Sequence, residues 1–341
     1  MEGTGLVLAG GGGKGAYQAG MLKALAEAGM LDDVVAISGT SIGAINAVLY
    51  AEGYAEGGTE KAVAQLTEAW EQIDYSVFLD IEYGEVIAGA RHFSRKATIK
   101  MIDDYVSPEL LADTAERHIP IIVTAARCPE YVVPTEHITD DELNLLMSTS
   151  TESTYTAYTV EYMPLTNKDE EYIKSALLAS TALPVIYNPV EVEGKLYIDG
   201  GVKDNVPIKP LYDMGIRRFI VIELKQESGI KFRDYFSDAE IIDILPSQNI
   251  GELLSGTMNF DKQDLAFKRH LGELDGKRYI KTLFEKDEDY IAVEKERAAL
   301  DYQHAKDRAS FESKYSSLSG SVNRNLDYIS NLEEKLKKYD K

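Results

Sequence analysis

Short apolar runs alternate with amphipathic segments along the first half of the chain. Thr4 to Ala9 predicts a buried strand that leads into the glycines at positions 10–13. The segment behind them predicts a helix that ends near Gly29, because small and apolar residues recur on one face. Val34 to Ile37 predicts a second buried strand, again followed by a glycine-rich turn and a helix. This repetition predicts an α/β fold in which helices cover a parallel sheet.

Further strands are predicted in the second half of the chain. Ile119 to Ala125 and Arg218 to Glu223 are apolar runs of strand length. Lys195 to Ile198 is a shorter one, and it stops at Asp199. Ser148 to Tyr162 is rich in Ser, Thr and Tyr with alternating polarity, which predicts a loop followed by an exposed strand.

Two segments have the pattern of a helix start. Ser107-Pro108-Glu109 places a hydroxyl at the capping position and a proline at the first helical position. Asn167 to Glu170 has the pattern of a capping box and predicts a helix that ends near Ser180. We therefore expect a helix to begin at each of them.

The last sixty residues differ from the rest. An apolar stripe typical of an amphipathic helix recurs there at spacings of 4, 3, 3 and 4 residues. It consists of Val322, Leu326, Ile329, Leu332 and Leu336. Residues 316–321, which include Gly320, separate this helix from an earlier one. We expect residues 281–341 to form a helical hairpin, which packs on the core or, as the less favoured option, mediates self-association. Residues 1–280 then form the main domain.

Composition and charge narrow the class of protein. The chain has 341 residues, of which 44% are hydrophobic and 27% charged, as in ordinary globular proteins. Its 36 Lys and Arg against 57 Asp and Glu give a formal net charge of −21. Such a polyanion argues against binding to nucleic acid, and also against long-range attraction to an anionic membrane. A small basic or apolar patch still allows docking on a lipid surface.

Other sequence features bear on metal sites and location. The one cysteine, Cys128, excludes an internal disulfide, and no Cys/His cluster has the spacing of zinc ligands. The first residues lack the pattern of a signal peptide, and the apolar runs are too short to span a membrane. We therefore expect a cytoplasmic protein that holds no metal.

The first candidate for chemistry is Gly39-Thr40-Ser41-Ile42-Gly43, a G-x-S-x-G pattern. It lies where the second strand ends and a helix begins. A tight turn of this kind needs small residues on both sides, because the serine backbone is strained and its Oγ must stand clear. The helix start behind it favours negative charge. Ser41 is therefore a candidate nucleophile, with a plain glycine-rich connection as the alternative.

The second candidate is Gly10-Gly11-Gly12-Gly13-Lys14-Gly15, between the first strand and the first helix. It matches G-x-G-x-x-G, but a dinucleotide site needs an acidic residue at the end of the second strand, and Asp32 and Asp33 precede that strand. A P-loop is excluded because Gly15 stands where Ser or Thr binds magnesium.

What remains in the glycine loop is a run of backbone N–H groups at a helix start, which suits an anion. Beside Ser41 it would bind the oxyanion of an acyl-transfer intermediate, where one donor is typically worth about 10²–10³ in rate. Lys14 either reinforces this anion site or is merely solvated, and the second reading is favoured.

A serine nucleophile needs a base. None of the five histidines (His92, His118, His137, His270 and His304) lies in a recognisable loop at a strand end. Asp199 does end a strand, and it leads into Gly200-Gly201. A partly desolvated carboxylate at that place can act as a base toward Ser41. An ordinary Asp-Gly-Gly turn is the alternative.

Taken together and in this order, the three motifs resemble the patatin-like phospholipase family, in particular its bacterial members. The likeness includes Leu6 to Gly20 (LVLAGGGGKGAYQAG), Val35 to Ala47, and Ala176 to Pro207, with its Asn205-Val206-Pro207 ending. It is good over residues 1–225 and weaker to about residue 275. The resemblance implies a three-layer α/β/α fold with a mostly parallel central sheet over residues 1–280, and a helical extension behind it.

Enzymes of this family are calcium-independent acyl hydrolases with a Ser–Asp dyad and no catalytic histidine, so the resemblance implies neither metal nor cofactor. It makes Ser41 the nucleophile, and Asp199 the base that activates first the serine and later a water. Backbone amides of Gly11, Gly12 and Gly13, joined by Ile42, would form the oxyanion hole. The supporting motif positions are Gly10, Lys14, Gly15, Gly39, Gly43, Gly200 and Gly201.

The expected activity is hydrolysis of phospholipid or lysophospholipid esters, with transient contact to a lipid surface. Three alternatives stay open. The same acyl-enzyme makes an acyltransferase if an alcohol outcompetes water. A soluble esterase or thioesterase would need no lipid interface. An interaction protein that keeps the fold would depend on the C-terminal hairpin, and its Ser41 would not react with a serine-hydrolase probe.

Overall fold

The computed structural model describes residues 2–73, 96–130, 155–184, 186–284 and 288. By their contacts, residues 1–280 form one compact unit and residues 281–341 another. Apart from 281–284 and 288, the expected hairpin of residues 281–341 lies outside the described residues and stays a prediction. The first unit contains all the motifs.

The centre of this unit is one mixed sheet of eight strands in the order β5-β6-β3-β2-β1-β7-β8, with β4 paired to β3. β3, β2, β1, β7 and β8 run parallel, whereas β4 and β6 run antiparallel to β3 and β5 antiparallel to β6. The strands are β1 Thr4–Leu8, β2 Val34–Thr40, β3 Ile121–Arg127, β4 Thr159–Pro164, β5 Val190–Val192, β6 Lys195–Asp199, β7 Arg218–Ile222 and β8 Glu240–Ile244. Every strand expected from the sequence is present, and β2 and β3 continue two or three residues further than expected.

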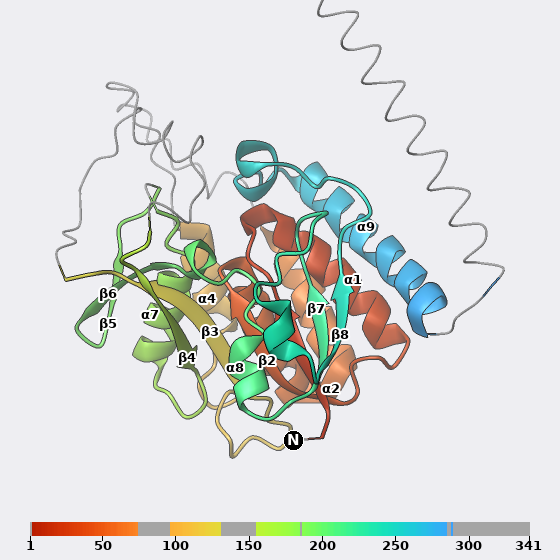
Figure 1. Cartoon of the computed structure of the whole chain (residues 1–341), viewed down its shortest axis with the longest axis horizontal. Coiled ribbons are helices and arrows are strands. Elements are labelled where there is room, and N and C mark those ends of the chain that lie inside the picture. Colours follow the sequence, from red (N-terminus) through yellow and green to blue (C-terminus); the bar gives the residue numbers. More distant parts are fainter. Residues whose placement is uncertain (1, 74–95, 131–154, 185, 285–287, 289–341) are drawn as a thin grey trace, which may run out of the picture. The chain divides into compact units, whose positions relative to one another are not determined.

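Helices cover both faces of the sheet (Figure 1). α1, α2, α4 and α7 lie over one face, with α9 packed on α1, and the short α8 lies over the other. The helices are α1 Gly15–Glu27, α2 Ile42–Gln72, α4 Lys96–Tyr105, α7 Glu170–Ser180, α8 Lys209–Asp213 and α9 Lys262–Tyr279. α2 is broken at Gly57 and Gly58, whose backbone angles are not helical.

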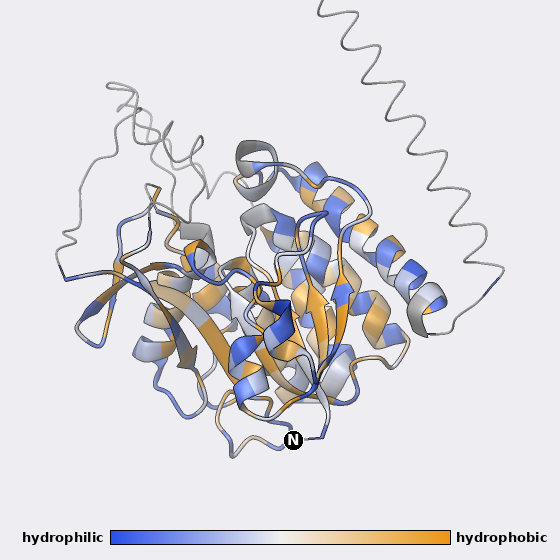
Figure 2. Cartoon of the chain, in the orientation of Figure 1, coloured by the Kyte–Doolittle hydropathy of each residue, from blue (hydrophilic) through white to orange (hydrophobic). Residues whose placement is uncertain are grey.

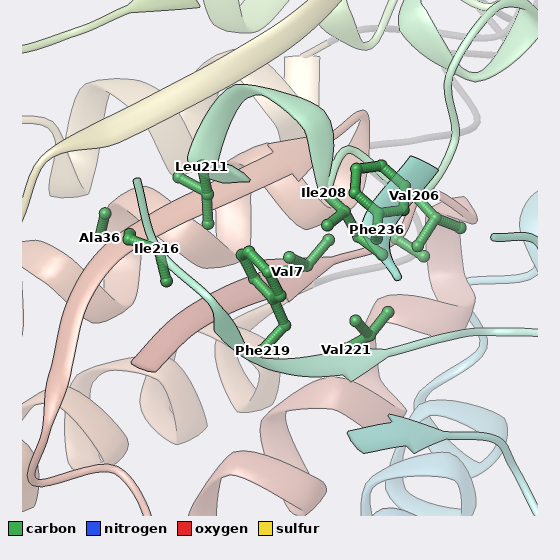
Figure 3. Packing of buried hydrophobic residues seen from close by; sticks show 10 residues of the cluster. Val7, Ala36, Val206, Ile208, Leu211, Ile216, Phe219, Val221 and Phe236 are labelled. Carbon is green, nitrogen blue, oxygen red and sulfur yellow. The ribbon is translucent and has the colours of Figure 1, made fainter. Parts of the chain in front are cut away.

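The core lies between the parallel strands and their helices, as the apolar colouring of the strands in Figure 2 shows. On the α8 face, Phe219 of β7 packs with Val7 of β1 and Leu211 of α8, and all three are fully buried (Figure 3). Parallel strands between two helical layers bury both faces, which explains why their sequences are continuous apolar runs.

The two predicted helix starts differ from the structure. Ser107 begins a series of turns and no helix. Its hydroxyl donates to Glu109, whereas a cap accepts from a helix N–H, and its own N–H donates to the buried Glu52 carboxylate. The second helix, α7, does end at Ser180, but its capping residue is Asp169, whose carboxylate accepts from Tyr172 N–H. The predicted capping position, Asn167, instead takes a positive φ of 58° in the preceding turn.

Within the described residues, none of the helices combines the length and apolar character that crossing a bilayer requires.

Candidate active site

The candidate site lies where two strands end against the same side of β3. β4 occupies one side of β3 from Ile122 to Arg127, so β2 and β6 share the other side. β2 runs parallel to β3, and its last residue, Thr40, faces Thr124. β6 runs antiparallel, and its last residue, Asp199, faces Ala125. The two strand ends therefore meet at consecutive residues of β3, which are about 3.3 Å apart along the strand.

Ser41 follows Thr40 in a sharp turn between β2 and α2. Its φ of 55° and ψ of −125° are values that residues with a side chain rarely adopt, so the turn is strained. α2 begins at Ile42 and puts its positive end behind the serine. A Cβ on Gly43 would lie 2.1 Å from the Leu8 carbonyl oxygen, so the close approach of α2 to β1 requires glycine at this position.

A buried hydroxyl supports the strained turn. Ser41 N–H donates to Ser180 Oγ over 2.8 Å, and Ser180 Oγ donates to the Thr124 carbonyl over 2.7 Å. Ser180 is fully buried at the end of α7. Its hydroxyl thus bridges the Ser41 N–H and the Thr124 carbonyl where the chain leaves β2. The bridge keeps both backbone groups hydrogen-bonded, which burial demands.

Asp199 is held by its own turn. Its side chain is 3% exposed, and Oδ1 accepts from Gly201 N–H over 2.7 Å. Its main-chain N–H donates to the Ala182 carbonyl over 2.8 Å, in the segment that follows α7. Gly200 packs directly on the Thr124 carbonyl. β6 before Asp199 and Gly200 after it therefore both lie against the part of β3 that pairs with the end of β2.

The glycine loop lies beside this turn, between β1 and α1. Gly10 packs on Ser41, with its missing Cβ position 3.1 Å from Ser41 Cβ. Gly12 has a φ of +55° and starts a short 3₁₀ turn that leads into α1. Within the described residues, the N–H groups of Gly11, Gly12 and Gly13 make no turn or side-chain hydrogen bond. These donors suit an oxyanion, and the positive end of α1 behind them favours negative charge.

A buried polar network fixes the start of α1. Gln18 Nε2 donates to the Ala9 carbonyl over 2.9 Å and to the Ile222 carbonyl over 3.1 Å, at the ends of β1 and β7. Asn46 on α2 donates to Gln18 Oε1 over 2.8 Å and accepts from Trp70 Nε1 over 2.9 Å. The network ties the glycine loop to the helix that follows Ser41.

The structure contradicts the expectation that Lys14 is solvated. Its side chain is 6% exposed, so the solvated reading is wrong. The side chain extends toward Gly256, near Lys268, and its ammonium group makes no hydrogen bond or ion pair within the described residues. Burial lowers the pKa of Lys14, an effect that the negative charge of Glu252 partly opposes.

A second polar cluster, in which only Glu223 is fully buried, lies at the ends of β7 and β8. Glu223 accepts from Gly229 N–H over 2.7 Å, and Ser228 Oγ donates to both Glu223 and Asp243, over 3.3 and 2.6 Å. Burial raises the pKa of Glu223 to about 7, helped by the neighbouring Asp243 carboxyl. Arg233 Nη1 lies 3.7 Å from Asp243 Oδ2.

The structure brings the three predicted motifs to one edge of the sheet. Gly39, one residue before the end of β2, packs on Gly43. Gly15 opens α1 against Ile42, and Gly200 and Gly201 follow β6. Sequence reasoning missed Ser180, Asn46 and Gln18. Asn46 had a visible signal, since it interrupts an otherwise apolar helix segment, and Ser180 stands in a run of small residues. An acyl hydrolase needs an apolar channel to its nucleophile, and the aromatic and apolar residues of segment 75–91 predict either its lining or ordinary core packing. This segment lies outside the described residues.

Comparisons with known proteins find a family match and distant relatives. A family model described as Patatin-like phospholipase matches residues 6–212. Lysophospholipase NTE1 of Cryptococcus neoformans var. neoformans serotype D is 27% identical over 235 residues, covering 68% of this chain and 12% of the relative. Neuropathy target esterase sws of Drosophila melanogaster is 24% identical over 244 residues, covering 69% and 14%. The chain thus spans about an eighth of the length of these curated relatives.

Two solved structures also match. VipD from Legionella pneumophila gives a TM-score of 0.41 at 14% identity, over 83% of this chain and 67% of that one. The ExoU–SpcU complex of the type III secretion system of Pseudomonas aeruginosa gives a TM-score of 0.36 at 18% identity, over 82% of this chain and 51% of that one.

Proposed function

Because this chain belongs to the patatin-like phospholipase family, we propose that it is a calcium-independent lipid acyl hydrolase that works through Ser41 and Asp199. The observation that carries the proposal is the meeting of β2 and β6 on β3, where Asp199 ends β6, Ser41 follows β2, and Gly10 of the glycine loop packs on Ser41. The names of the curated relatives favour a lysophospholipid or phospholipid as the substrate.

The first step forms an acyl-enzyme. Ser41 Oγ attacks the ester carbonyl carbon while Asp199 takes the hydroxyl proton. The carbonyl oxygen becomes an oxyanion, which the N–H groups of Gly11, Gly12 and Gly13 bind, together with that of Ile42. When the tetrahedral intermediate collapses, the alcohol leaves with the proton that Asp199 returns.

The second step reverses these roles. A water gives its proton to Asp199 and attacks the acyl carbon, and the same N–H groups bind the second oxyanion. Ser41 Oγ then leaves as a hydroxyl, taking the proton back from Asp199, and the fatty acid is released. One carboxylate serves both steps because each proton transfer is the reverse of the other.

Labelling of the purified protein with a fluorophosphonate probe tests the proposal, together with hydrolysis of lysophosphatidylcholine. We expect the wild type to react and Ser41→Ala to lose both activities. Asp199→Asn should keep the fold, because an amide oxygen still accepts from Gly201 N–H, yet react at least about 10²-fold more slowly. Ser237→Ala, at an exposed serine, is the control.

Labelling that survives in Ser41→Ala would show that another residue is the nucleophile. A folded wild type that neither reacts nor hydrolyses the lipid would contradict the proposal. Addition of an acceptor alcohol distinguishes the acyltransferase alternative, which predicts that a new ester replaces the free fatty acid.

A further inference from the structure

The segment that follows the Asp199 turn touches all three motifs. Ser38 Oγ donates to the Pro207 carbonyl over 2.6 Å, and Thr40 Oγ1 donates to the Asp204 carbonyl over 2.9 Å. The segment 204–207 is thereby fixed to β2, just before Ser41. Its second residue, Asn205, faces the glycine loop.

Asn205 holds Gly10 by two hydrogen bonds. Gly10 N–H donates to the Asn205 carbonyl over 3.3 Å, and Asn205 Nδ2 donates to the Gly10 carbonyl over 3.2 Å. Because a carbonyl oxygen can only accept, the second bond identifies the nitrogen of the side-chain amide. The amide oxygen, Oδ1, therefore points away from the Gly10 carbonyl.

That amide oxygen fills the space left by two motif glycines. A Cβ on Gly10 would lie 2.6 Å from Asn205 Oδ1, and one on Gly201 would lie 2.8 Å from the same atom. The first of these positions is 3.1 Å from Ser41 Cβ, and the second is 3.0 Å from Asp199 Oδ1. A single side chain thus lies between the loop beside the serine and the turn that holds the aspartate.

We propose that Asn205 is a positioning residue for the reaction at Ser41. Its amide fixes the distance between the glycine loop and the Asp199 turn, so that the oxyanion donors and the base face Ser41 at the same time. The inference rests on the proposed function. A displacement of about 1 Å at a reacting centre can cost about 10² in rate, which is the size of effect that loss of this contact would produce.

Asn205→Ala tests the role. We expect kcat for lysophosphatidylcholine to fall by about 10²-fold with KM within about threefold of the wild type, because ground-state binding does not need the aligned donors. The rate of fluorophosphonate labelling should fall by a similar factor. A residue needed only for folding would reduce the fraction of labelled protein and leave the rate of the folded fraction unchanged. Asn167→Gly is the control, since it removes a comparable side chain without straining the positive φ.

Gly201→Ala provides an independent test. Its methyl group would collide with Asn205 Oδ1, so this variant should lose activity too. In the double variant Asn205→Ala/Gly201→Ala the collision with Asn205 is absent and only the 3.0 Å approach to Asp199 Oδ1 remains, so the two losses should not multiply. The double variant should be at least as active as Gly201→Ala alone.

Two results would overturn the inference while leaving the proposed function in place: an Asn205→Ala variant with kcat within about threefold of the wild type, or losses that multiply in the double variant. A folded wild type without labelling or hydrolysis would instead overturn the proposed function, and this inference with it.

Discussion

Two polar clusters at the same edge of the sheet carry different unfavourable terms. At the end of β2, Ser41 has a strained backbone, and its N–H donates to a neutral group, the Ser180 hydroxyl. At the ends of β7 and β8, the backbone is ordinary but two carboxyls, Glu223 and Asp243, share the hydroxyl of Ser228.

The two clusters should therefore be sensitive to different perturbations. Strain at Ser41 is held by close packing, so added atoms should disturb it strongly while pH should affect its fold little. The carboxyl pair is held by a proton that the unfolded chain would release, so pH should disturb it strongly. Four measurements test this difference between the two clusters.

The largest effect is expected for Gly43→Ala. The new methyl group would lie 2.1 Å from the Leu8 carbonyl oxygen, so α2 or β1 must move, at a cost of about 3 kcal/mol or more. Urea unfolding measures the loss. Gly194→Ala is the control, because its φ is +76° but its surroundings are open, and it should lose only about 1 kcal/mol. Equal losses in the two variants would show that packing does not hold the serine turn.

The next effect concerns pH. The raised pKa of Glu223, about 7, means that the folded state keeps a proton that the unfolded state releases above its ordinary pKa of 4.5. The contribution of Glu223 to the free energy of unfolding is therefore fully present below pH 4.5. It is lost as the pH rises through about 7, and the loss is on the order of 2–3 kcal/mol.

Urea unfolding at pH 5 and pH 8 measures this loss, and Glu223→Gln should reduce it. Adding Glu52→Gln should reduce the pH dependence of stability that remains in Glu223→Gln, because burial raises the pKa of Glu52 to about 8. Glu227→Gln, at an exposed carboxyl, should change nothing. A pH dependence that is the same in Glu223→Gln as in the wild type would contradict the contrast.

Ser180→Ala comes third. It leaves the N–H of Ser41 and the carbonyl of Thr124 without their bridge, at a cost of about 2 kcal/mol. Because the strained turn then relaxes, we also expect fluorophosphonate labelling to slow by about tenfold or more. Thr181→Val is the control, since that neighbouring hydroxyl bonds only to helix carbonyls. Unchanged labelling in folded Ser180→Ala would show that the bridge does not position Ser41.

The smallest effect is a comparison at Ser41 itself. Ser41→Gly and Ser41→Ala both remove the nucleophile, but glycine tolerates the φ of 55° and alanine does not. The free energy of unfolding should therefore be about 1 kcal/mol higher for Ser41→Gly. At Ser38, where φ is not positive, the order should reverse. A Ser41→Ala variant at least as stable as Ser41→Gly would mean that the turn is not strained.

Much of the fold was accessible from local patterns. Apolar runs predicted β1, β2, β3, β6 and β7, and alternating polarity predicted β4. Small and apolar residues that recur on one face predicted α1. No helix begins at Ser107, where the hydroxyl donates to the Glu109 carboxylate and the backbone N–H donates to the distant Glu52. A capping pattern describes only neighbours in sequence, and it has no information about a partner 55 residues away.

Local sequence patterns were enough to select the residues capable of chemistry: a serine and an aspartate at strand ends, and a run of glycines at a helix start. The folded chain was needed to show that β2 and β6 end at consecutive residues of β3, and that Ser180 and Asn205 bridge the motifs. Local patterns cannot show this, because strand order and register depend on long-range packing and hydrogen bonds. The alternation of apolar and polar residues fixes which face of a strand is buried, but it leaves the neighbouring strand unspecified.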